Sequence, residues 1–376
     1  MRTARTLSLY VMRETLVYAS LSFLAVTLVL LTQNLLVRLD ELLLIGMNPG
    51  ELLRLAACLL PVVLTYSIPL AFLVGIVLAA RRFGSDGELL GMRAAGIGPD
   101  GLLVPNLVLG LCASVLLAWL VVSLEHTSRR QLVSLFKTVA ARGAILEPGR
   151  FRRVGRQLIF VEQRLQDGGL SGVMIYDAGA QGRAYRLFAE RGRFEFDDAR
   201  SEIEIELWNG DVHLDPTESD PNRSARIHFD SFSVGIDVSH ILGNELGPVR
   251  PKQMTRGELK SVLERAKRGD PLKELDQKNP IAYELEIQRR QTLPFAPLLF
   301  AGVGVPIALA SEQRGGRLGL PIALAAAFAY FALGNLAESI AQQGWLPAAQ
   351  ASWIPNALFL IAAFLLARFV RHRLPR

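Results

Sequence analysis

Six long blocks of apolar residues place the strongest constraint on the fold of this chain. None of the six contains an aspartate, glutamate, lysine, arginine or histidine. A bilayer core of about 30 Å is crossed by roughly 20 helical residues, and backbone groups cannot stay unpaired in lipid. The sequence therefore predicts six transmembrane helices. The blocks are residues 15–37, 55–80, 102–124, 293–311, 318–337 and 351–367.

The first block is expected to be a retained helix. It is 23 residues long, whereas the apolar core of a cleaved signal peptide has about 7–15 residues. No small-residue cleavage site follows it. We therefore count it among the six spans.

Arginine is distributed asymmetrically between the two ends of these spans. The short loops and chain ends on one side hold twelve arginines, and the short loops on the other side hold two. Because basic residues concentrate in cytoplasmic loops, both termini are predicted to be cytoplasmic and residues 125–292 external. The twelve are Arg2, Arg5, Arg13, Arg81, Arg82, Arg93, Arg314, Arg317, Arg368, Arg371, Arg373 and Arg376, and the two are Arg38 and Arg54.

The net charge of +6 does not indicate a nucleic-acid partner. The polar stretch 125–292 contains 27 basic and 26 acidic residues, so it is nearly neutral. The excess lies beside the apolar blocks, where it fits membrane orientation better than a grip on phosphate backbones. The 51% of hydrophobic residues is thus an average over apolar spans and one charge-rich region.

The central polar stretch changes from helical to β pattern near Phe151. Alternating or β-branched runs occur at 157–162, 172–176, 185–189, 193–196, 202–208 and 226–234. Their spacing predicts an antiparallel sandwich or barrel, and the Asn209-Gly210 pair predicts a hairpin turn. A capping-box spacing at Thr255 and Glu258 predicts a helix to Arg268, and a second polar helix is expected at 282–291.

Three regions follow from this pattern. Residues 1–124 form the first membrane half, residues 125–292 form the external β domain with flanking helices, and residues 293–376 form the second membrane half. The predicted fold class is therefore a membrane α-helical protein, three spans plus three, around an inserted all-β domain.

Catalytic and metal-binding motifs are missing from the sequence. No P-loop, nucleophile elbow, H-E-x-x-H motif or paired-cysteine motif occurs, and the five histidines have no ligand spacing. Cys58 and Cys112 lie inside apolar blocks. Glu204 and Glu206 are conceivable as an acid and base pair, but a solvated strand face explains them better. We predict no catalytic residue and no metal, and because the blocks lack ionisable groups, any transport needs energy from a partner.

The loop between the second and third blocks is the most informative short segment. Residues 85–96 are expected to form a short amphipathic helix, with Ser85 as N-cap and Gly96 as the stop. Its apolar face is expected to hold Leu89 and Met92, with Leu90 as a further candidate. Glu88 stands three residues after the N-cap. Two interpretations remain open: a helix on the lipid surface, or a coupling helix that docks on a cytoplasmic ATPase.

The same segment resembles the corresponding loop of the lipopolysaccharide-export permeases, the LptF/LptG family (YjgP/YjgQ-type). The resemblance rests on small, acidic and apolar residues leading to Met92-Arg93-Ala94-Ala95-Gly96, and on the layout of three spans, β domain and three spans. Residues 13–16 and 314–317 are similar to the LptF branch.

The resemblance implies a bacterial inner-membrane transporter. Family members pair, LptF with LptG, on a dimer of the ATPase LptB, which binds ATP and Mg, so no cofactor is expected on this chain. Lipopolysaccharide enters a cavity from the outer leaflet and passes to a periplasmic β-jellyroll, then to LptC and LptA of the bridge. The alternative is a membrane-anchored binding or scaffold protein without transport activity.

The resemblance also assigns candidate site residues. Glu88, Leu89, Met92 and Arg93 are expected to couple to the ATPase. Arg38, Arg54, Arg289 and Arg290 are candidates for lipid phosphates, since a guanidinium suits that group, although snorkelling to the membrane surface is the alternative. Apolar residues of the β domain are expected in its core or in an acyl groove: Phe160, Ile175, Leu187, Phe194, Phe196, Ile205, Leu207 and Phe229.

Overall fold

The computed structural model of the protein contains two compact units. One unit holds residues 1–34, 58–129 and 251–376, and the other holds residues 35–57 and 130–250. Each unit is described by itself below. The residues described are 2–37, 49–141, 148–154, 157–165, 169–177, 184–197, 202–214, 225–236, 251–268, 280–312 and 317–373.

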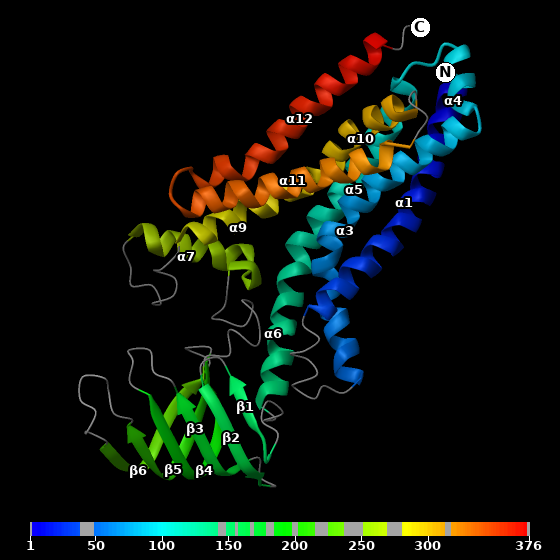
Figure 1. Cartoon of the computed structure of the whole chain (residues 1–376). Helices are drawn as coiled ribbons and strands as arrows, with labels where there is room; N and C mark the ends of the chain where they lie inside the picture. The colour runs from blue at the N-terminus through cyan, green and yellow to red at the C-terminus, as the bar shows by residue number, and fades with distance from the viewer. Residues whose placement is uncertain are drawn as a thin grey trace. The chain divides into compact units, whose positions relative to one another are not determined.

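Each predicted span corresponds to a long helix, apart from one to three residues at the end of four spans, and the six helices are apolar and long enough to cross a bilayer. The helices extend beyond the apolar blocks, because flanking polar residues continue the same turns into the interfacial zone. They are visible as long rods in Figure 1. Their bounds are α1 Arg2–Leu36, α3 Pro49–Ser85, α5 Asp100–Ser123, α10 Ala296–Glu312, α11 Gly319–Gln342 and α12 Ala348–Arg373.

Two of these helices form the centre of the bundle. In the most apolar stretch of α3, 67% of the residues are buried, and in that of the segment Pro280–Glu312 the share is 72%. In α1 only 11% of the residues of this stretch are buried. Phe300 on α10 is fully buried and its ring meets the rings of Tyr330 on α11 and Phe359 on α12. The apolar surfaces of α1, α11 and α12 are therefore left for lipid or for a partner.

A polar helical segment leads into α10. Helix α7 (Arg256–Arg268) begins with the predicted capping box: the Thr255 amide donates to Glu258 Oε2 at 2.7 Å, and the Glu258 amide donates to Thr255 Oγ1 at 3.3 Å. Helix α9 (Pro280–Thr292) follows, and a 3₁₀ turn (Leu293–Phe295) joins it to α10. Both predicted helices are confirmed, and both belong to the unit of the membrane helices.

Helix α9 is buried on more than one face. Tyr283 packs with Leu259 and Val262 of α7. Leu285 packs against alanines of α11 and α12, among them Ala341 and Ala351. Small residues on the two long helices allow α9 to approach them closely, so α9 is held between α7 and the membrane bundle.

The second unit contains one antiparallel sheet in which every strand pairs with the next along the chain. The six strands among the described residues equal the predicted runs in number but differ in extent. The runs 185–189 and 193–196 are parts of the single strand β4, and β1 was not among the predicted runs. The described strands form one sheet, and a jellyroll-like arrangement stays a prediction. The bounds are β1 Phe151–Val154, β2 Gln157–Arg164, β3 Leu170–Asp177, β4 Tyr185–Asp197, β5 Glu202–Leu214 and β6 Ala225–Ile236.

The hairpin predicted at Asn209-Gly210 is wrong, because β5 continues through both residues. Asn209 has φ +50° and Gly172 on β3 has φ +63°. The strand registers place both opposite Glu190 of β4, so the two left-handed residues lie on one row across the sheet. The positive φ of Asn209 therefore lies inside a continuous strand with unbroken register and not in a turn.

The buried face of the sheet contains most of the predicted core residues. Ile175, Leu187, Ile205 and Leu207 are each 0% exposed. Phe229 is also buried and Phe160 is half-buried. The side chains of Phe194 and Phe196 lie outside the described residues. The predicted fold class, a helical membrane protein with an inserted β domain, is confirmed.

Candidate functional site

Helix α4 (Glu88–Ala94) connects α3 to α5 and occupies the segment predicted as a coupling helix. Its N-cap is Gly87, with φ 73°, and not Ser85 as predicted. Ser85 is the last residue of α3, and its hydroxyl donates to the carbonyl of Arg82 at 2.9 Å. The capping prediction fails because α3 runs five residues past its apolar block.

The predicted stop at Gly96 is confirmed. Gly96 has φ +75°, its amide donates to Arg93 O, and the amide of Ile97 donates to Met92 O, both at 2.9 Å. This pair of bonds is a Schellman motif, which satisfies the last carbonyls of a helix and requires a left-handed residue. Glycine is favoured here because it has no Cβ penalty at positive φ.

The apolar face of α4 is buried against this chain. Leu89 and Met92 are 7% and 9% exposed and join a core cluster with Phe83 of α3 and Val11 of α1. Leu90 on the other face is 72% exposed, and Gly91 and Ala94 beside it are also exposed. Leu89 and Met92 thus fix the helix in place, and the surface open to a partner centres on Leu90.

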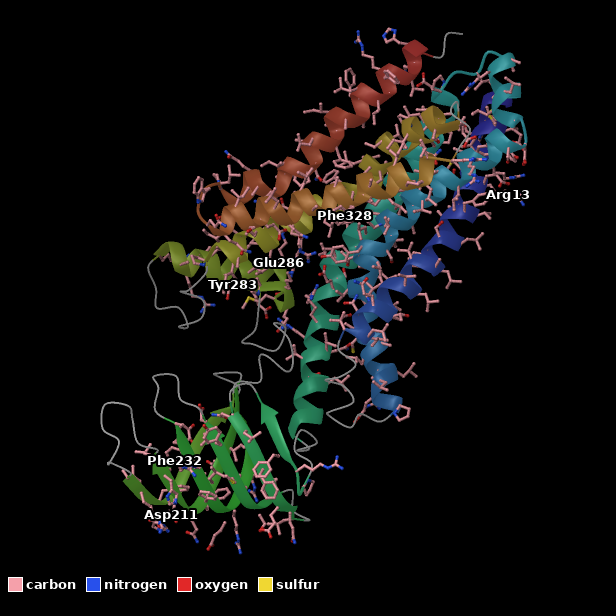
Figure 2. The ribbon with its side chains drawn as sticks, in the orientation of Figure 1. Arg13, Asp211, Phe232, Tyr283, Glu286 and Phe328 are labelled. Atoms are coloured by element: carbon pink, nitrogen blue, oxygen red, sulfur yellow. The ribbon has the colours of Figure 1, made fainter. Side chains whose placement is uncertain are left out.

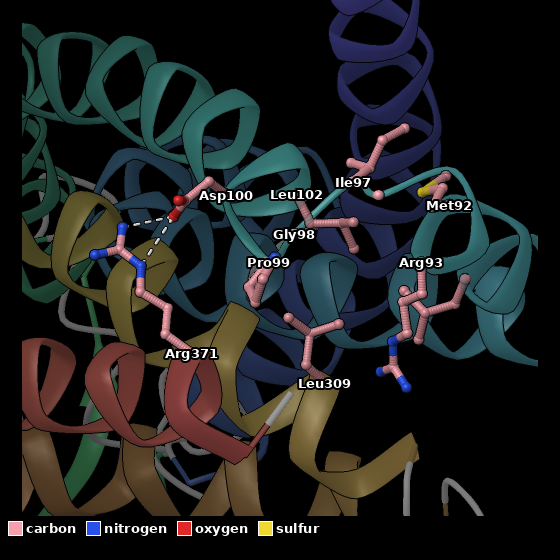
Figure 3. A pocket seen from close by; sticks show the side chains of 11 residues that line it. Met92, Arg93, Ile97, Gly98, Pro99, Asp100, Leu102, Leu309 and Arg371 are labelled. Atoms are coloured by element: carbon pink, nitrogen blue, oxygen red, sulfur yellow. Dashed lines mark hydrogen bonds and ion pairs between the residues drawn. The ribbon is translucent and has the colours of Figure 1, made fainter. Parts of the chain in front are cut away.

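A cavity of about 510 Å³ lies next to α4, between the α4–α5 loop and α12. Figure 3 shows Arg371 of α12 bonded to Asp100 there, and Arg371 Nη2 is 2.6 Å from Asp100 Oδ1. Arg93 lines the same cavity, and its Nη2 is buried without a hydrogen-bond partner. Arg93 is therefore directed into the cavity rather than toward open solvent.

At the α9 end of the bundle, five charged residues form a buried group that we call the α9 ion cluster. Arg289 Nη2 is 2.7 Å from Glu125 Oε1, and Arg289 Nε is 2.9 Å from Glu286 Oε2. Arg290 Nε is 2.7 Å from Glu286 Oε1, and Arg129 Nη2 is 3.0 Å from Glu125 Oε1. All five are below 10% exposure. Figure 2 labels Glu286 on α9.

The α9 ion cluster has one more positive than negative charge, since three arginines meet two glutamates. Among the described residues, no side chain or backbone group forms a hydrogen bond with Arg289 Nη1 or Glu125 Oε2. Arg289 also lines a cavity of about 70 Å³ with Glu338 and Ser352, whose hydroxyl is likewise unpartnered. A polar cavity of this size is large enough to hold water.

The four arginines predicted to meet lipid phosphates lie in different surroundings. Arg54 on α3 is exposed. Arg289 and Arg290 are buried, and their charges are engaged by Glu286 and Glu125. Arg38 lies outside the described residues. Phosphate binding stays a prediction for all four.

Several residues of these sites were missed in the sequence. Glu125 and Glu286 stand three or four residues before arginines, a helical ion-pair spacing that is visible in the sequence. Tyr10 and Glu14 contact the α3–α4 corner, and nothing in their local pattern points to that contact. The sequence lacks such a signal because the contact joins residues far apart in the chain.

The sheet carries one strong surface ion pair. Arg226 Nη2 is 2.7 Å from Asp211 Oδ2, and His228 Nδ1 is 3.3 Å from Asp211 Oδ1. The hydrogen bond from Arg226 lowers the pKa of Asp211 to about 2 and raises the pKa of Arg226. Figure 2 labels Asp211 and the half-exposed Phe232 on this sheet. The pair is exposed, so it orders the β5–β6 surface without forming a reactive site.

Metal chemistry finds no support in the described part of the chain. No group of three or more metal-ligating side chains occurs among the described residues. Cys58 and Cys112 are free thiols.

Six apolar helices, a β-sheet inserted between the third and fourth, and a short helix seated between the second and third define a class: a multi-pass membrane protein with an inserted β domain. The sequence matches the family described as lipopolysaccharide export system permease LptF/LptG over residues 9–368, and the chain belongs to that family. Members are permease components of the lipopolysaccharide export transporter of the inner membrane, not enzymes themselves. The match does not separate LptF from LptG, so the LptF branch stays a prediction. A search of curated proteins found no match.

Proposed function

We propose that this chain takes lipopolysaccharide from the outer leaflet of the inner membrane and passes it to a periplasmic bridge, driven by a separate ATPase. The family match over residues 9–368 carries this proposal. In the proposed orientation both termini and α4 face the cytoplasm, and the sheet faces the periplasm. The positive-inside distribution of arginine supports this orientation.

Helix α4 is the proposed site of coupling to an LptB-type ATPase dimer. A helix of seven residues is too short to be stable alone, so its position depends on packing. Leu89 and Met92 supply that packing, and the Schellman motif fixes its end. A displacement of α4 by a partner bound around Leu90 would therefore be transmitted through Leu89 and Met92 to the membrane helices.

Energy is proposed to come from that ATPase alone. ATP and Mg would bind to the partner, and this chain would bind no cofactor directly. The central stretches of the spans lack ionisable residues, which disfavours an ion-driven mechanism. A paralogous permease, LptG-type if this chain is LptF, would complete the membrane cavity along the exposed apolar helices.

The lipid path is proposed to begin at basic residues and end at the sheet. Arg54 is exposed, and Arg289 has a free Nη1, so these two are the better candidates for phosphate contact. The sheet unit would receive the lipid before LptC-type and LptA-type proteins take it. Replacing Arg54 by alanine is expected to weaken lipopolysaccharide binding, whereas replacing the exposed Arg256 on α7 should not.

The proposal is tested by gentle solubilisation and purification of the full chain from its own membranes. We expect a second permease and an ATPase to copurify in fixed proportion, together with lipopolysaccharide. A protein that purifies alone, free of both ATPase and lipid, would support the scaffold alternative instead.

A further inference from the structure

Helix α1 is tied to the α3–α4 corner by two polar side chains one helical turn apart. The hydroxyl of Tyr10 lies 2.9 Å from both carboxylate oxygens of Glu88 on α4. Glu14 forms an ion pair with Arg82 of α3, and Arg82 Nε is 3.2 Å from Asp86. We call Tyr10, Glu14, Arg82 and Glu88 the α1 clamp.

Apolar packing supports the α1 clamp. The ring centroid of Tyr10 is 5.8 Å from that of Phe83, which is 1% exposed. Phe83 also belongs to the core cluster that contains Leu89 and Met92 of α4. Tyr10 therefore contacts α4 through its hydroxyl and the C-terminal turn of α3 through its ring.

The rest of α1 is held to α3 by few and small contacts. A Cβ on Gly75 would lie 2.5 Å from Ala19 Cα, so the two backbones approach closely at that level. Farther along, the hydroxyl of Thr27 donates to Ser67 Oγ at 3.0 Å. These contacts succeed one another along the two helices from the α1 clamp outward. Since α1 is only 11% buried in its apolar stretch, it depends on this line of contacts for its position.

We propose that Tyr10 is a positioning residue that makes α1 follow α4, so that a displacement of α4 moves α1 within the membrane. This inference rests on the proposed function, in which an ATPase moves α4. The role of the Glu88 carboxylate is then to accept the hydroxyl of Tyr10 from within the same chain. Movement of α1 would alter the exposed apolar surface that α1 presents to lipid or to the second permease.

A competing role for Glu88 is direct contact with the ATPase through its negative charge. The two roles make different demands on the side chain. Glutamine at position 88 loses the charge but keeps an oxygen that accepts the Tyr10 hydrogen bond. Phenylalanine at position 10 keeps the ring on Phe83 but removes the hydroxyl. Glu88→Gln and Tyr10→Phe therefore separate the two roles.

The test compares lipid transferred per ATP hydrolysed in the reconstituted complex of the full chain with its ATPase. Tyr10→Phe and Glu88→Ala are each expected to lower this ratio by about fivefold or more, a typical size for coupling between sites, with ATP hydrolysis retained. The double variant Tyr10→Phe/Glu88→Ala should be no worse than Glu88→Ala, and Glu88→Gln should stay near wild type. Tyr18→Phe, the same change two turns along α1, is the matched control.

The amount of ATPase that copurifies serves as the check on assembly and folding, and it should be equal in all these variants. A normal ratio in Tyr10→Phe would overturn the inference, and a low ratio in Glu88→Gln beside it would favour direct ATPase contact. Additive losses in the double variant would overturn it as well. If the wild-type complex transfers no lipid, the proposed function itself fails, so the two failures are distinguishable.

Discussion

Arg289 and Glu125 meet in one ion pair at 2.7 Å although 164 positions separate them in the sequence. The pair joins the first residue of α6 (Glu125–Ala141) to α9, and Arg289 also binds Glu286 on its own helix. One guanidinium thus connects the end of the first membrane half to the helix that begins the second. Because the site is buried, the connection depends on keeping both charge signs present.

Removing the central guanidinium of the α9 ion cluster should destabilise the protein strongly. Arg289→Met leaves Glu125 with Arg129 and Glu286 with Arg290, so the loss is that of the hydrogen bonds that Arg289 makes to the two carboxylates, each worth about 1.5–3 kcal/mol. Thermal unfolding in detergent measures the effect. Arg265→Met on the exposed surface of α7 is the control and should shift the unfolding midpoint little. Equal midpoints for the two variants would contradict this assignment.

Removing two opposite charges together should be less damaging than removing one. Glu286→Met alone leaves Arg289 and Arg290 short of negative charge. In Glu286→Met/Arg290→Met the remaining Arg289 and Arg129 still share Glu125. Replacing a buried pair by apolar residues is often close to neutral, so the double variant should unfold at a higher temperature than the single one. A lower midpoint for the double variant would rule out the charge-balance explanation.

The surface around Leu90 should control ATPase binding. Leu90→Asp places a charge at the centre of the proposed docking surface without disturbing Leu89 or Met92. We expect copurification of the ATPase to fall by about tenfold or more, as for loss of an interface anchor worth about 2 kcal/mol. Leu165→Asp, at an exposed leucine in the sheet unit, is the control. Undiminished copurification with Leu90→Asp would place the docking surface elsewhere.

The left-handed backbone conformation at position 209 of β5 should tolerate glycine and should be strained by a β-branched residue. Asn209 has φ +50°, a conformation that costs ordinary residues roughly 1–2 kcal/mol and costs glycine nothing. Asn209→Val is therefore expected to speed hydrogen exchange of the β5 amides in the full chain, and Asn209→Gly is expected to preserve protection. Similar protection in both variants would mean that this backbone conformation is unnecessary.

The Asp211–Arg226 pair should make a small contribution that depends on pH in a defined direction. The pKa of Asp211 is lowered to about 2 by its hydrogen bond from Arg226, below the value of about 4 expected in the unfolded chain. The stabilisation is thus fully present above about pH 4 and disappears as the pH falls through about 2. The difference in unfolding midpoint between wild type and Asp211→Asn should be small at neutral pH and shrink only in that acid range. A difference that stays constant as the pH falls through this acid range would contradict the assignment.

The sequence predicted the helices well because their signal is local. An uncharged stretch long enough to cross a bilayer has one structural solution, and the Thr255–Glu258 capping box and the Gly96 stop are likewise set by neighbouring residues. The prediction of Ser85 as N-cap failed because the end of α3 and the start of α4 lie close together in the sequence. Helix α3 continues through Ser85, so Gly87 is the N-cap of α4.

The sheet shows where local signals mislead. Asn209-Gly210 has the composition of a hairpin turn, yet pairing with β4 and β6 on both sides keeps these residues inside β5. A left-handed residue is expected in a turn, yet here it lies in a strand, and only the partner strands decide between the two.

The candidate sites were predictable only in part. Glu88, Leu89, Met92 and Arg93 were placed on the correct short helix, but the sequence could not tell that Leu89 and Met92 face inward. The contacts of Tyr10 and Arg289 join distant segments, so neither composition nor spacing foretells them. Coupling and phosphate binding remain to be measured for all eight predicted site residues.

The most direct test of the account is ATP-dependent transfer of lipopolysaccharide from proteoliposomes containing this chain, its permease partner and the ATPase to a soluble bridge protein. The account predicts transfer that requires ATP, Mg and this chain, and that falls in Leu90→Asp because the ATPase no longer engages α4. Transfer that proceeds equally without this chain, or no transfer from a complete and ATP-hydrolysing complex, would contradict it.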